Sequence, residues 1–349
     1  MTVVVCLKIL CLTWTPTGSR RMHDLSSVLG AEEWNYSVFY RVKLLSPIRY
    51  VIQAIRTFIM LVESKPEVVF VQNPPIFAAL TCVIYGRIYR VKIIIDHHSV
   101  WSMGEIITNP VVKSFINSVE KFCVSRAYLN TTYTDCWEYV LIRIGAKKAL
   151  TIYDFVDEEW VEEADFTFAE RLPKEGKVVV MSCGGGHALE RPDLLFEACR
   201  DLNVTLVITG RKRFLRKHIR KAHELNVENV VFAGFLSDRE YRGLIASCDF
   251  VADLSLQPYG IPHVVTEALA AGRPIILGRN PAVEKLLGKD CPFVIPENDV
   301  DTIRRAFVLA FENQKDYVKL AAELYRDLKK RRGEQLERLF GQMHLRARG

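Results

Sequence analysis

The hydrophobic and polar positions of the chain follow two alternating patterns. Short runs of β-branched and apolar residues are followed by longer stretches in which apolar positions recur at helical spacing. This alternation is typical of parallel βαβ units, because a crossover helix leads to each parallel strand. In the first half, the predicted strands are Val3–Leu12, Tyr36–Arg41, Val68–Gln72, Val91–Ile95, Ala127–Thr131 and Ala149–Tyr153. The predicted helices span Met22–Gly30, Pro47–Glu63, Ile76–Tyr89, Asn109–Ser125 and Asp135–Ile144.

The alternation pauses over an acidic stretch and then resumes. Residues 158–175 end in Leu-Pro-Lys-Glu and are followed by Gly176, which predicts a linker. The second series has strands at Lys177–Ser182, Thr205–Thr209, Val230–Ala233, Phe250–Asp253, Pro274–Leu277 and Phe293–Ile295. Its helices span Arg191–Asp201, Arg213–Leu225, Asp238–Ser247, Val264–Ala271, Ala282–Leu287 and Val300–Phe311.

Two such series predict an α/β protein with two Rossmann-like, doubly wound domains that face a cleft. We place the first domain at 1–157 and the second at 176–312. A charged helix pair is expected at 313–349, packed on the surface or crossing back to the first domain. At 349 residues the chain is too long for one core, which agrees with two domains.

The nine cysteines are scattered singly, mostly in apolar stretches, with no Cys-x-x-Cys pair. Free buried thiols predict a cytoplasmic protein. The apolar N-terminus carries Lys8 and lacks a cleavage pattern, so it is expected to form a buried strand rather than a signal peptide. The longest other charge-free apolar run, Ile76–Gly86, is too short to span a bilayer.

The positive charge of the chain is concentrated in its first half. Residues 1–150 contain 17 Lys and Arg but 10 Asp and Glu. This bias favours phosphates or anionic lipid as partners, although chance asymmetry of a solvated surface is the alternative. The basic and aromatic helix Pro47–Glu63 fits either a membrane surface or the core, and we favour the core. No aromatic motif interleaves with the basic residues, so we expect no nucleic-acid partner.

Residues 248–277 contain the most informative segment, in which a strand leads through a Gly-Ile-Pro loop into a helix. Gly260 allows close approach of the backbone to an anion, and Pro262 fixes the chain before the helix. The N–H groups of residues 263–265 lie at a helix N-terminus, which carries about half a positive charge. Glu267, one turn later, can accept hydrogen bonds from ribose hydroxyls. The segment predicts a pyrophosphate site; an ordinary capped crossover helix is the alternative.

This segment resembles the GT-B glycosyltransferases of family four, which includes sucrose and phosphatidylinositol mannosyl transferases. The positions that match the family's Glu-Gly-Phe-Pro-Asn-Val-Val-Leu-Glu-Ala-Met-Ala-Cys-Gly-x-Pro-Val-like segment in register are Gly260, Pro262, Val264, Val265, Glu267, Ala268, Ala270, Gly272 and Pro274. The resemblance implies a hexosyltransferase that moves mannose, glucose or GlcNAc from a nucleoside-diphosphate sugar to an acceptor hydroxyl. In this segment it places the donor on Tyr259, Gly260, Ile261, Pro262, His263, Val264 and Glu267. Tyr259 stands where the family has a glutamate that contacts the donor sugar, which leaves the sugar open.

A second anion-binding loop is predicted after the strand Lys177–Ser182. Gly184, Gly185 and Gly186 follow this strand and precede a helix; a flexible turn is the alternative. In the family a lysine follows this loop, and this chain has Glu190 at that position. The candidate cations for the phosphates are therefore Arg191, Arg211 and Lys212.

Polar residues end two neighbouring strands of the first domain. Asp96 and His98 are predicted to be catalytic, because a histidine or aspartate at a strand end can take the proton of the acceptor hydroxyl. The residues predicted to bind the acceptor are Gly18, Ser19, Arg20, Arg21, Asn73 and His97. The Gln-Asn-Pro-Pro, Ile-Asp-x-His and Tyr-Asp segments here are similar to those of the β-mannosyltransferases that extend dolichol-linked chitobiose. That likeness implies a lipid-linked or glycan acceptor and peripheral contact with an anionic membrane at its cytoplasmic face.

No cofactor and no metal are expected, since GT-B enzymes generally need no metal in the site. Asp299-Val300-Asp301 resembles a metal-binding Asp-x-Asp motif, but it precedes a helix and is expected to cap it. Two other functions remain open. One is a non-catalytic GT-B homologue that acts as a nucleotide-binding or partner subunit, and the other is a sugar-nucleotide epimerase of the same fold.

Overall fold

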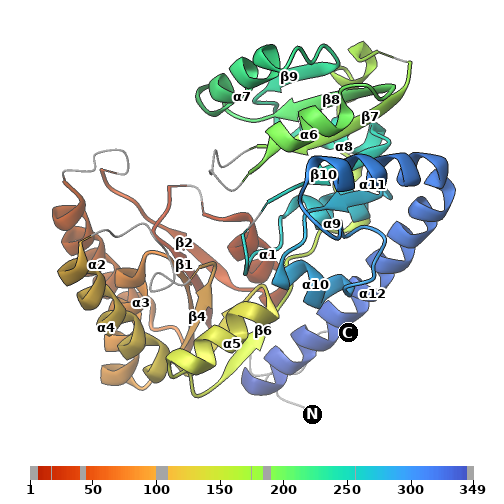
Figure 1. Cartoon of the computed structure of the whole chain (residues 1–349). Helices are drawn as coiled ribbons and strands as arrows, with labels where there is room; N and C mark the ends of the chain where they lie inside the picture. The colour runs from red at the N-terminus through yellow and green to blue at the C-terminus, as the bar shows by residue number, and fades with distance from the viewer. Residues whose placement is uncertain are drawn as a thin grey trace. The chain divides into compact units, whose positions relative to one another are not determined.

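A computed structural model describes residues 7–16, 18–39, 45–99, 109–173, 175–183, 190–255 and 257–343. The chain forms two compact units, Met1–Tyr153 and Asp154–Gly349 (Figure 1). Each unit has one parallel β-sheet, and this confirms the predicted pair of doubly wound α/β domains. Among the described residues, no helix combines the length and apolar character that a bilayer crossing requires.

The sheet of unit 1 has the strand order β2-β1-β3-β4-β5-β6. Its strands are β1 (Ile9–Thr13), β2 (Glu32–Asn35), β3 (Val68–Asn73), β4 (Lys92–His97), β5 (Leu129–Thr132) and β6 (Ala149–Thr151). Its helices are α1 (Arg20–Leu29), α2 (Ser46–Ser64), α3 (Ile76–Tyr89), α4 (Pro110–Arg126) and α5 (Asp135–Ile144). The strands β1, β3 and β4 are buried almost throughout, as expected for a parallel sheet covered on both faces.

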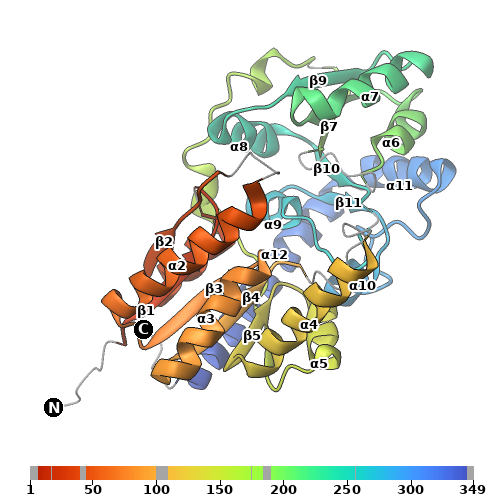
Figure 2. The same ribbon diagram turned by 90° about the vertical axis from the view of Figure 1, so that its left-hand side faces the viewer.

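Helices α2, α3 and α4 lie side by side on one face of this sheet, and α1 lies on the other face (Figures 1 and 2). This arrangement follows from right-handed crossovers, because the chain turns back after β2 and then moves in one direction from β3 to β6. The direction changes between β1 and β3. Ligands of such sheets bind at this switch point, beyond the carboxyl ends of the strands.

The sheet of unit 2 has the strand order β11-β10-β7-β8-β9. Its strands are β7 (Lys177–Ser182), β8 (Val204–Thr209), β9 (Val230–Gly234), β10 (Phe250–Asp253) and β11 (Ile275–Leu277). Its helices are α6 (Pro192–Cys199), α7 (Lys212–Glu224), α8 (Asp238–Ser247), α9 (Val264–Ala270), α10 (Pro281–Leu287), α11 (Val300–Glu312) and α12 (Gln314–Met343). The switch point of this unit lies between β7 and β10.

Several predicted elements differ from those observed. The second strand occupies Glu32–Asn35 and not Tyr36–Arg41. Phe293–Ile295 contributes only an isolated bridge between Val294 and Leu277 instead of a full strand. The expected C-terminal helix pair is one 30-residue helix, α12, which contacts α9 and α11.

The segment predicted as a linker belongs to unit 2. It contains the short 3₁₀ helices η3 (Glu158–Val161) and η4 (Ala169–Arg171), which pack against α8, and η3 also contacts α9. The residues just before it are held by α12. The Phe155 ring stacks on Tyr325 with centroids 5.2 Å apart, and the Tyr325 hydroxyl donates to the Val156 carbonyl at 3.1 Å.

Candidate functional site

The two loops predicted to bind phosphate leave adjacent strands of unit 2. β7 ends at Ser182 and β10 ends at Asp253, and these strands pair in parallel register. The carboxyl ends of both strands therefore lie at the switch point, where this architecture binds ligands. Gly184, Gly185 and Gly186 lie outside the described residues.

The loop after β10 reaches α9 through Gly260, which is buried, and His263, which is exposed. The amide of Val265 donates to the Pro262 carbonyl at 3.0 Å, so one of the three N–H groups predicted for an anion closes the turn itself. Tyr259, Ile261 and Pro262 are half-buried and Val264 is buried. The turn therefore presents part of its backbone, and not all of it, to solvent.

Glu267 lies one turn into α9 and is almost completely buried. Its Oε2 accepts a hydrogen bond from the Tyr241 hydroxyl at 3.1 Å, which links α8 to α9. Buried carboxylates need such donors, because desolvation of the charge is costly. The sequence placed Glu267 at the site, and the structure adds Tyr241 as the residue that fixes its orientation.

His263 is tied to the start of unit 2. Its Nδ1 lies 3.5 Å from Oδ2 of Asp154, the first residue of unit 2. The helix α9 also contacts η3 and α12. The end of the loop after β10 and the helix that follows it are therefore held by other segments of the same unit, which favours a preformed site over a loop that orders on binding.

A buried aspartate and a half-buried glutamate interact at the switch point. Asp253, the last residue of β10, accepts a hydrogen bond from the Ser255 amide at 2.8 Å. Burial and, to a lesser degree, the Glu190 carboxylate raise the pKa of Asp253 to about 7, although the hydrogen bond from the Ser255 amide lowers it. Glu190 therefore lies close enough to Asp253 for their charges to interact. The interaction of Glu190 with Asp253 was not predicted from the sequence, although Glu190 was noted to occupy the position where the family has a lysine.

The three predicted phosphate cations differ in their contacts. Arg191 donates to Asp193 through Nε and Nη2, at 2.9 Å for the shorter contact, so its guanidinium is already paired. Arg211 and Lys212 are exposed at the end of the loop after β8. The Arg211 guanidinium lies 6.0 Å from the ring centroid of Phe235, which follows β9 and is 73% exposed. Phe235 is an exposed aromatic ring at the carboxyl edge, a feature that the sequence pattern did not single out as a site.

Gly210 connects β8 to Arg211 and cannot be replaced without strain. Its φ is +148°, and a Cβ atom there would lie 2.6 Å from the Cys183 carbonyl oxygen. The loops after β7 and β8 thus approach each other at the level of their backbones. This close packing brings Arg211 toward the switch point.

In unit 1, Asp96 and Arg21 form a buried bidentate ion pair. Nε and Nη2 of Arg21 each donate to Asp96 at 2.8 Å, and the Thr131 hydroxyl donates to the same carboxylate at 2.7 Å. Arg21 also donates to the Ile152 carbonyl at 2.7 Å. Both side chains are at most 5% exposed. Burial and full hydrogen bonding argue against proton transfer by Asp96 and against contact of Arg21 with an acceptor.

His97 and Asn73 are also interior residues, both 0% exposed. Asn130 donates through Nδ2 to the Val124 carbonyl at 3.0 Å, so its Oδ1 accepts from Nε2 of His97 at 3.0 Å. Nδ1 of His97 then accepts from Nδ2 of Asn73 at 3.1 Å. Burial lowers the pKa of His97, which agrees with this neutral ring. Complete burial of both side chains argues against their predicted contact with an acceptor.

The remaining predicted residues of unit 1 are accessible. His98 is half-buried, its amide donates to the Asn73 carbonyl at 2.8 Å, and its ring stacks on Tyr133 with centroids 5.2 Å apart. Ser19 caps α1 by accepting from the Met22 amide at 3.1 Å, Gly18 is half-buried and Arg20 is exposed. Of the two adjacent histidines at this edge, His98 is thus the one that is partly exposed.

A pocket of about 210 Å³ lies at the switch point of unit 1. It is lined by Trp14, Thr15, Ser37, Arg49, Tyr50, Gln53, Pro74 and Pro75. The Trp14 and Tyr50 rings stack with centroids 6.2 Å apart, and the Arg49 guanidinium lies 4.8 Å from the Tyr50 centroid. The pocket is smaller than the ~300–1,000 Å³ of typical small-molecule sites, so it suits one part of a substrate. Only the Gln-Asn-Pro-Pro segment pointed to it from the sequence.

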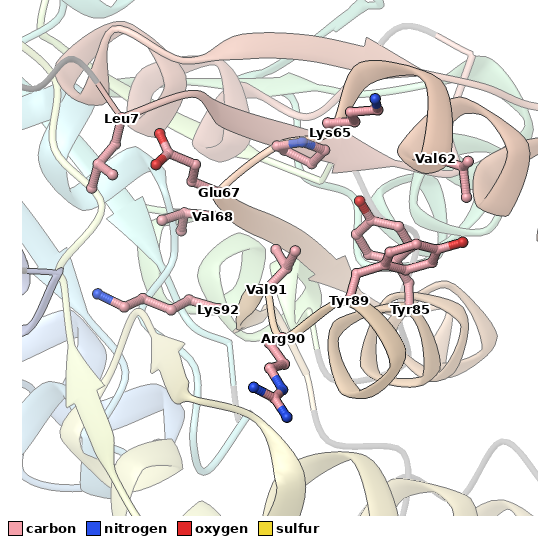
Figure 3. A pocket seen from close by; sticks show the side chains of 11 residues that line it. Leu7, Val62, Lys65, Glu67, Val68, Tyr85, Tyr89, Arg90, Val91 and Lys92 are labelled. Atoms are coloured by element: carbon pink, nitrogen blue, oxygen red, sulfur yellow. The ribbon is translucent and has the colours of Figure 1, made fainter.

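A larger hollow of about 590 Å³ lies at the opposite, amino-terminal edge of the same sheet (Figure 3). Three of its lining residues are the cations Lys65, Arg90 and Lys92. Their charged ends point in different directions in Figure 3, so they do not form one anion site. This position, away from the carboxyl ends, argues against the hollow as the active site.

The Asp-x-Asp segment is a helix cap, as predicted. Asp299 accepts from the Thr302 amide at 2.9 Å at the start of α11. Hydrogen bonds from Thr302 hold the pKa of Asp299 below its usual value.

Comparisons with known proteins agree with this geometry. Residues 163–331 match the model of the family Glycosyl transferases group 1. No match was found among curated proteins.

Solved structures show the same fold at low sequence identity. HepE of Anabaena, in complex with UDP, has a TM-score of 0.73 at 14% identity over 96% of this chain and 100% of that chain. Sucrose-phosphate synthase of Thermosynechococcus elongatus has a TM-score of 0.76 at 13% identity, over 97% and 99%. A putative UDP-N-acetylglucosamine 2-epimerase of Listeria monocytogenes has a TM-score of 0.62 at 11% identity, over 90% and 91%. The chain therefore has the GT-B fold, and residues 163–331 match the model for glycosyl transferases group 1.

Proposed function

We propose that the protein is a hexosyltransferase that uses a nucleoside-diphosphate sugar, with the donor bound by unit 2. The observation that carries the proposal is the convergence of two loops at the β7–β10 switch point, one of which leads to Gly260 and the buried Glu267. The match of residues 163–331 to the glycosyl transferases group 1 model supports it. HepE, which was solved with UDP, supports a uridine nucleotide as the first donor to test.

In this proposal the diphosphate lies against the loops after β7 and β10. Glu267, oriented by Tyr241, accepts hydrogen bonds from the ribose. Arg211 and Lys212 supply positive charge, since Arg191 is already paired with Asp193. Phe235, together with Arg211, offers a surface on which the nucleobase stacks.

The acceptor binds to unit 1 near His98 and the pocket lined by Trp14 and Tyr50. During transfer, the bond between the anomeric carbon and the diphosphate oxygen breaks, and a bond from the acceptor oxygen to that carbon forms. His98 takes the proton of the acceptor hydroxyl, and the nucleoside diphosphate leaves with the additional negative charge. Cationic side chains and backbone N–H groups stabilise this charge in the transition state more than in the ground state.

The family resemblance implies retention at the anomeric carbon, whereas the mannosyltransferase resemblance implies inversion, and the proposal leaves this open. We propose a lipid-linked or glycan acceptor and a cytoplasmic protein that contacts the cytoplasmic face of a membrane. No metal is required by this proposal, because the charge of the leaving group is balanced by side chains and backbone.

A donor panel tests the proposal. UDP, GDP and ADP are first ranked by thermal shift, and the sugars of the best nucleotide are then incubated with and without lipid-linked and free glycan acceptors. Acceptor-dependent release of nucleotide supports the transferase. Release of nucleotide without any acceptor supports the epimerase. Binding without turnover of any donor supports a non-catalytic homologue, an alternative that arises because Tyr259 and Glu190 replace the family's usual glutamate and lysine.

A further inference from the structure

We infer that the outer face of helices α2, α3 and α4 is the surface by which unit 1 docks on an anionic lipid bilayer. The inference deepens the proposed membrane contact, and it rests on the proposed function only in taking the acceptor to be lipid-linked. It begins with the orientation of α2, which differs from the one favoured by the sequence.

The apolar stripe of α2 faces outward. Ile48, Val51, Ile55 and Ile59 recur every three or four residues, and their side chains are 43–59% exposed. The opposite side of the helix buries Gln53, Thr57 and Leu61. A helix that served only as a core element would have the reverse arrangement.

Specific contacts fix this orientation. The Trp14 indole donates to the Thr57 hydroxyl at 2.9 Å. The Gln53 amide donates to the Tyr36 carbonyl at 3.0 Å. Because these buried polar groups would lose their partners, α2 cannot rotate to bury the isoleucines without a substantial cost.

The neighbouring helices continue the apolar surface. Phe58 of α2 contacts Tyr85 and Tyr89 of α3, with ring centroids 5.9 and 6.4 Å apart, and α3 in turn packs against α4. The further exposed apolar residues on this layer are Ile84, Ile88 and Tyr89 of α3 and Val111, Val112 and Phe115 of α4. Exposed apolar residues that gather on neighbouring helices in this way favour an interaction surface.

The charge of the layer identifies the partner. The three helices contain six Lys and Arg but two Asp and Glu, and one of these two, Glu120, is buried. Exposed cations such as Arg56, Arg87 and Lys121 border the apolar residues. An apolar surface bordered by cations is complementary to an anionic bilayer, in which acyl chains lie beneath negative headgroups.

The same helix also lines the pocket of unit 1. Arg49, Tyr50 and Gln53 contribute to the pocket, while Ile48 and Val51 lie in the exposed stripe. A polar headgroup in the pocket would therefore lie within about one helical turn of the membrane-facing stripe. This arrangement suits an acceptor whose lipid tail stays in the bilayer.

Vesicle flotation with the full chain tests the inference. The vesicles are made of phosphatidylcholine alone or with about 30 mol% phosphatidylglycerol, at low salt and at about 0.5 M NaCl. We expect binding to the anionic vesicles at low salt, and at least about fivefold less binding to neutral vesicles or at high salt.

Substitutions that introduce a carboxylate distinguish binding through this surface from non-specific binding of the protein to vesicles. Val51→Glu combined with Ile55→Glu places carboxylates on the stripe, and we expect a loss of at least about tenfold in vesicle binding. Leu309→Glu in unit 2 is the matched control, because Leu309 on α11 is 53% exposed and Ile55 is 56% exposed, and it should bind as the wild type does. Circular dichroism and thermal melting confirm that all variants fold.

Three outcomes would overturn the inference. The first is no binding of the wild type to anionic vesicles at low salt, and the second is equal binding by the wild type and the α2 double variant. The third is a wild-type mass in solution of twice 40.0 kDa together with a monomeric double variant, which would make the face a dimer interface. Nucleotide binding is measured on the same samples. Its persistence in the double variant would show that failure of membrane docking leaves the donor chemistry intact.

Discussion

Arg21 holds both carboxylate oxygens of Asp96 in a buried ion pair, with two contacts of 2.8 Å. The pair joins α1 to the end of β4, the strand that His98 follows directly. We therefore predict that Asp96→Ala lowers the free energy of unfolding by about 3–5 kcal/mol, because it leaves a buried cation uncompensated. Urea or thermal unfolding of the variant measures this loss.

His98→Ala should lower turnover and leave the free energy of unfolding almost unchanged. His98 is only half-buried, so we expect unfolding within about 1 kcal/mol of the wild type. Loss of a general base lowers turnover about 10²–10⁴-fold. Wild-type turnover by this variant, measured once a donor and acceptor are found, would remove His98 from the mechanism.

Tyr241 is predicted to be a positioning residue for Glu267. Tyr241→Phe removes the donor to Oε2 and should weaken nucleotide binding about threefold, whereas Glu267→Ala should weaken it about tenfold or more. Isothermal titration calorimetry measures both values. Tyr317→Phe is a control, because the Tyr317 hydroxyl contacts the Pro292 carbonyl, at 3.4 Å. Equal affinity of Glu267→Ala and wild type would contradict the role of Glu267.

Asp253 predicts a dependence of stability on pH. Its pKa of about 7 lies above the value of 3.8 expected for a solvated side chain, so the fold favours the protonated form. Stability from this group is fully present below about pH 4 and is lost as pH rises toward 7. Asp253→Asn keeps an acceptor for the Ser255 amide but does not titrate. The stability gained by this substitution should be on the order of 3 kcal/mol larger at pH 8 than at pH 5. An equal gain in stability at both pH values would show that ionisation of Asp253 does not destabilise the fold.

Arg49 is predicted to bind the acceptor. Arg49→Ala should raise the KM for a short, water-soluble acceptor headgroup about tenfold without changing the affinity for nucleotide. Arg56→Ala is the matched control, because Arg56 lies on the exposed side of the same helix and does not line the pocket. Equal KM values for the two variants would contradict the assignment of the pocket.

The sequence predicted the two parallel sheets because most of their strands carry an apolar run, as in Val68–Val71. The strand β2, Glu32–Asn35, has no such run, and its position was predicted wrongly. It also predicted the carboxyl-edge positions of Gly260 and Glu267, since local spacing places them after a strand. It did not separate the interior polar residues Arg21, Asp96 and His97 from an active site. Both have polar residues at strand ends, and only tertiary contacts distinguish them.

The orientation of α2 and the pairing of Glu190 with Asp253 also depend on tertiary structure. Helical periodicity shows that Ile48, Val51, Ile55 and Ile59 share one face, but it does not show whether the face is buried. That face is exposed because the opposite one finds polar partners in Trp14 and Tyr36, which are distant in sequence. Similarly, the charge interaction at the switch point joins Asp253, at the end of β10, with Glu190, which lies just before α6.

Hydrogen exchange with and without a nucleoside diphosphate tests the central claim most directly. At saturating nucleotide, found by calorimetry, we predict that amides in peptides covering residues 257–270 and 203–213 of unit 2 exchange more slowly, while peptides of α6 and α11 do not change. Glu267→Ala should need about tenfold more nucleotide for the same protection. Protection confined to unit 1, or no protection by any nucleoside diphosphate, would contradict donor binding at the β7–β10 switch point.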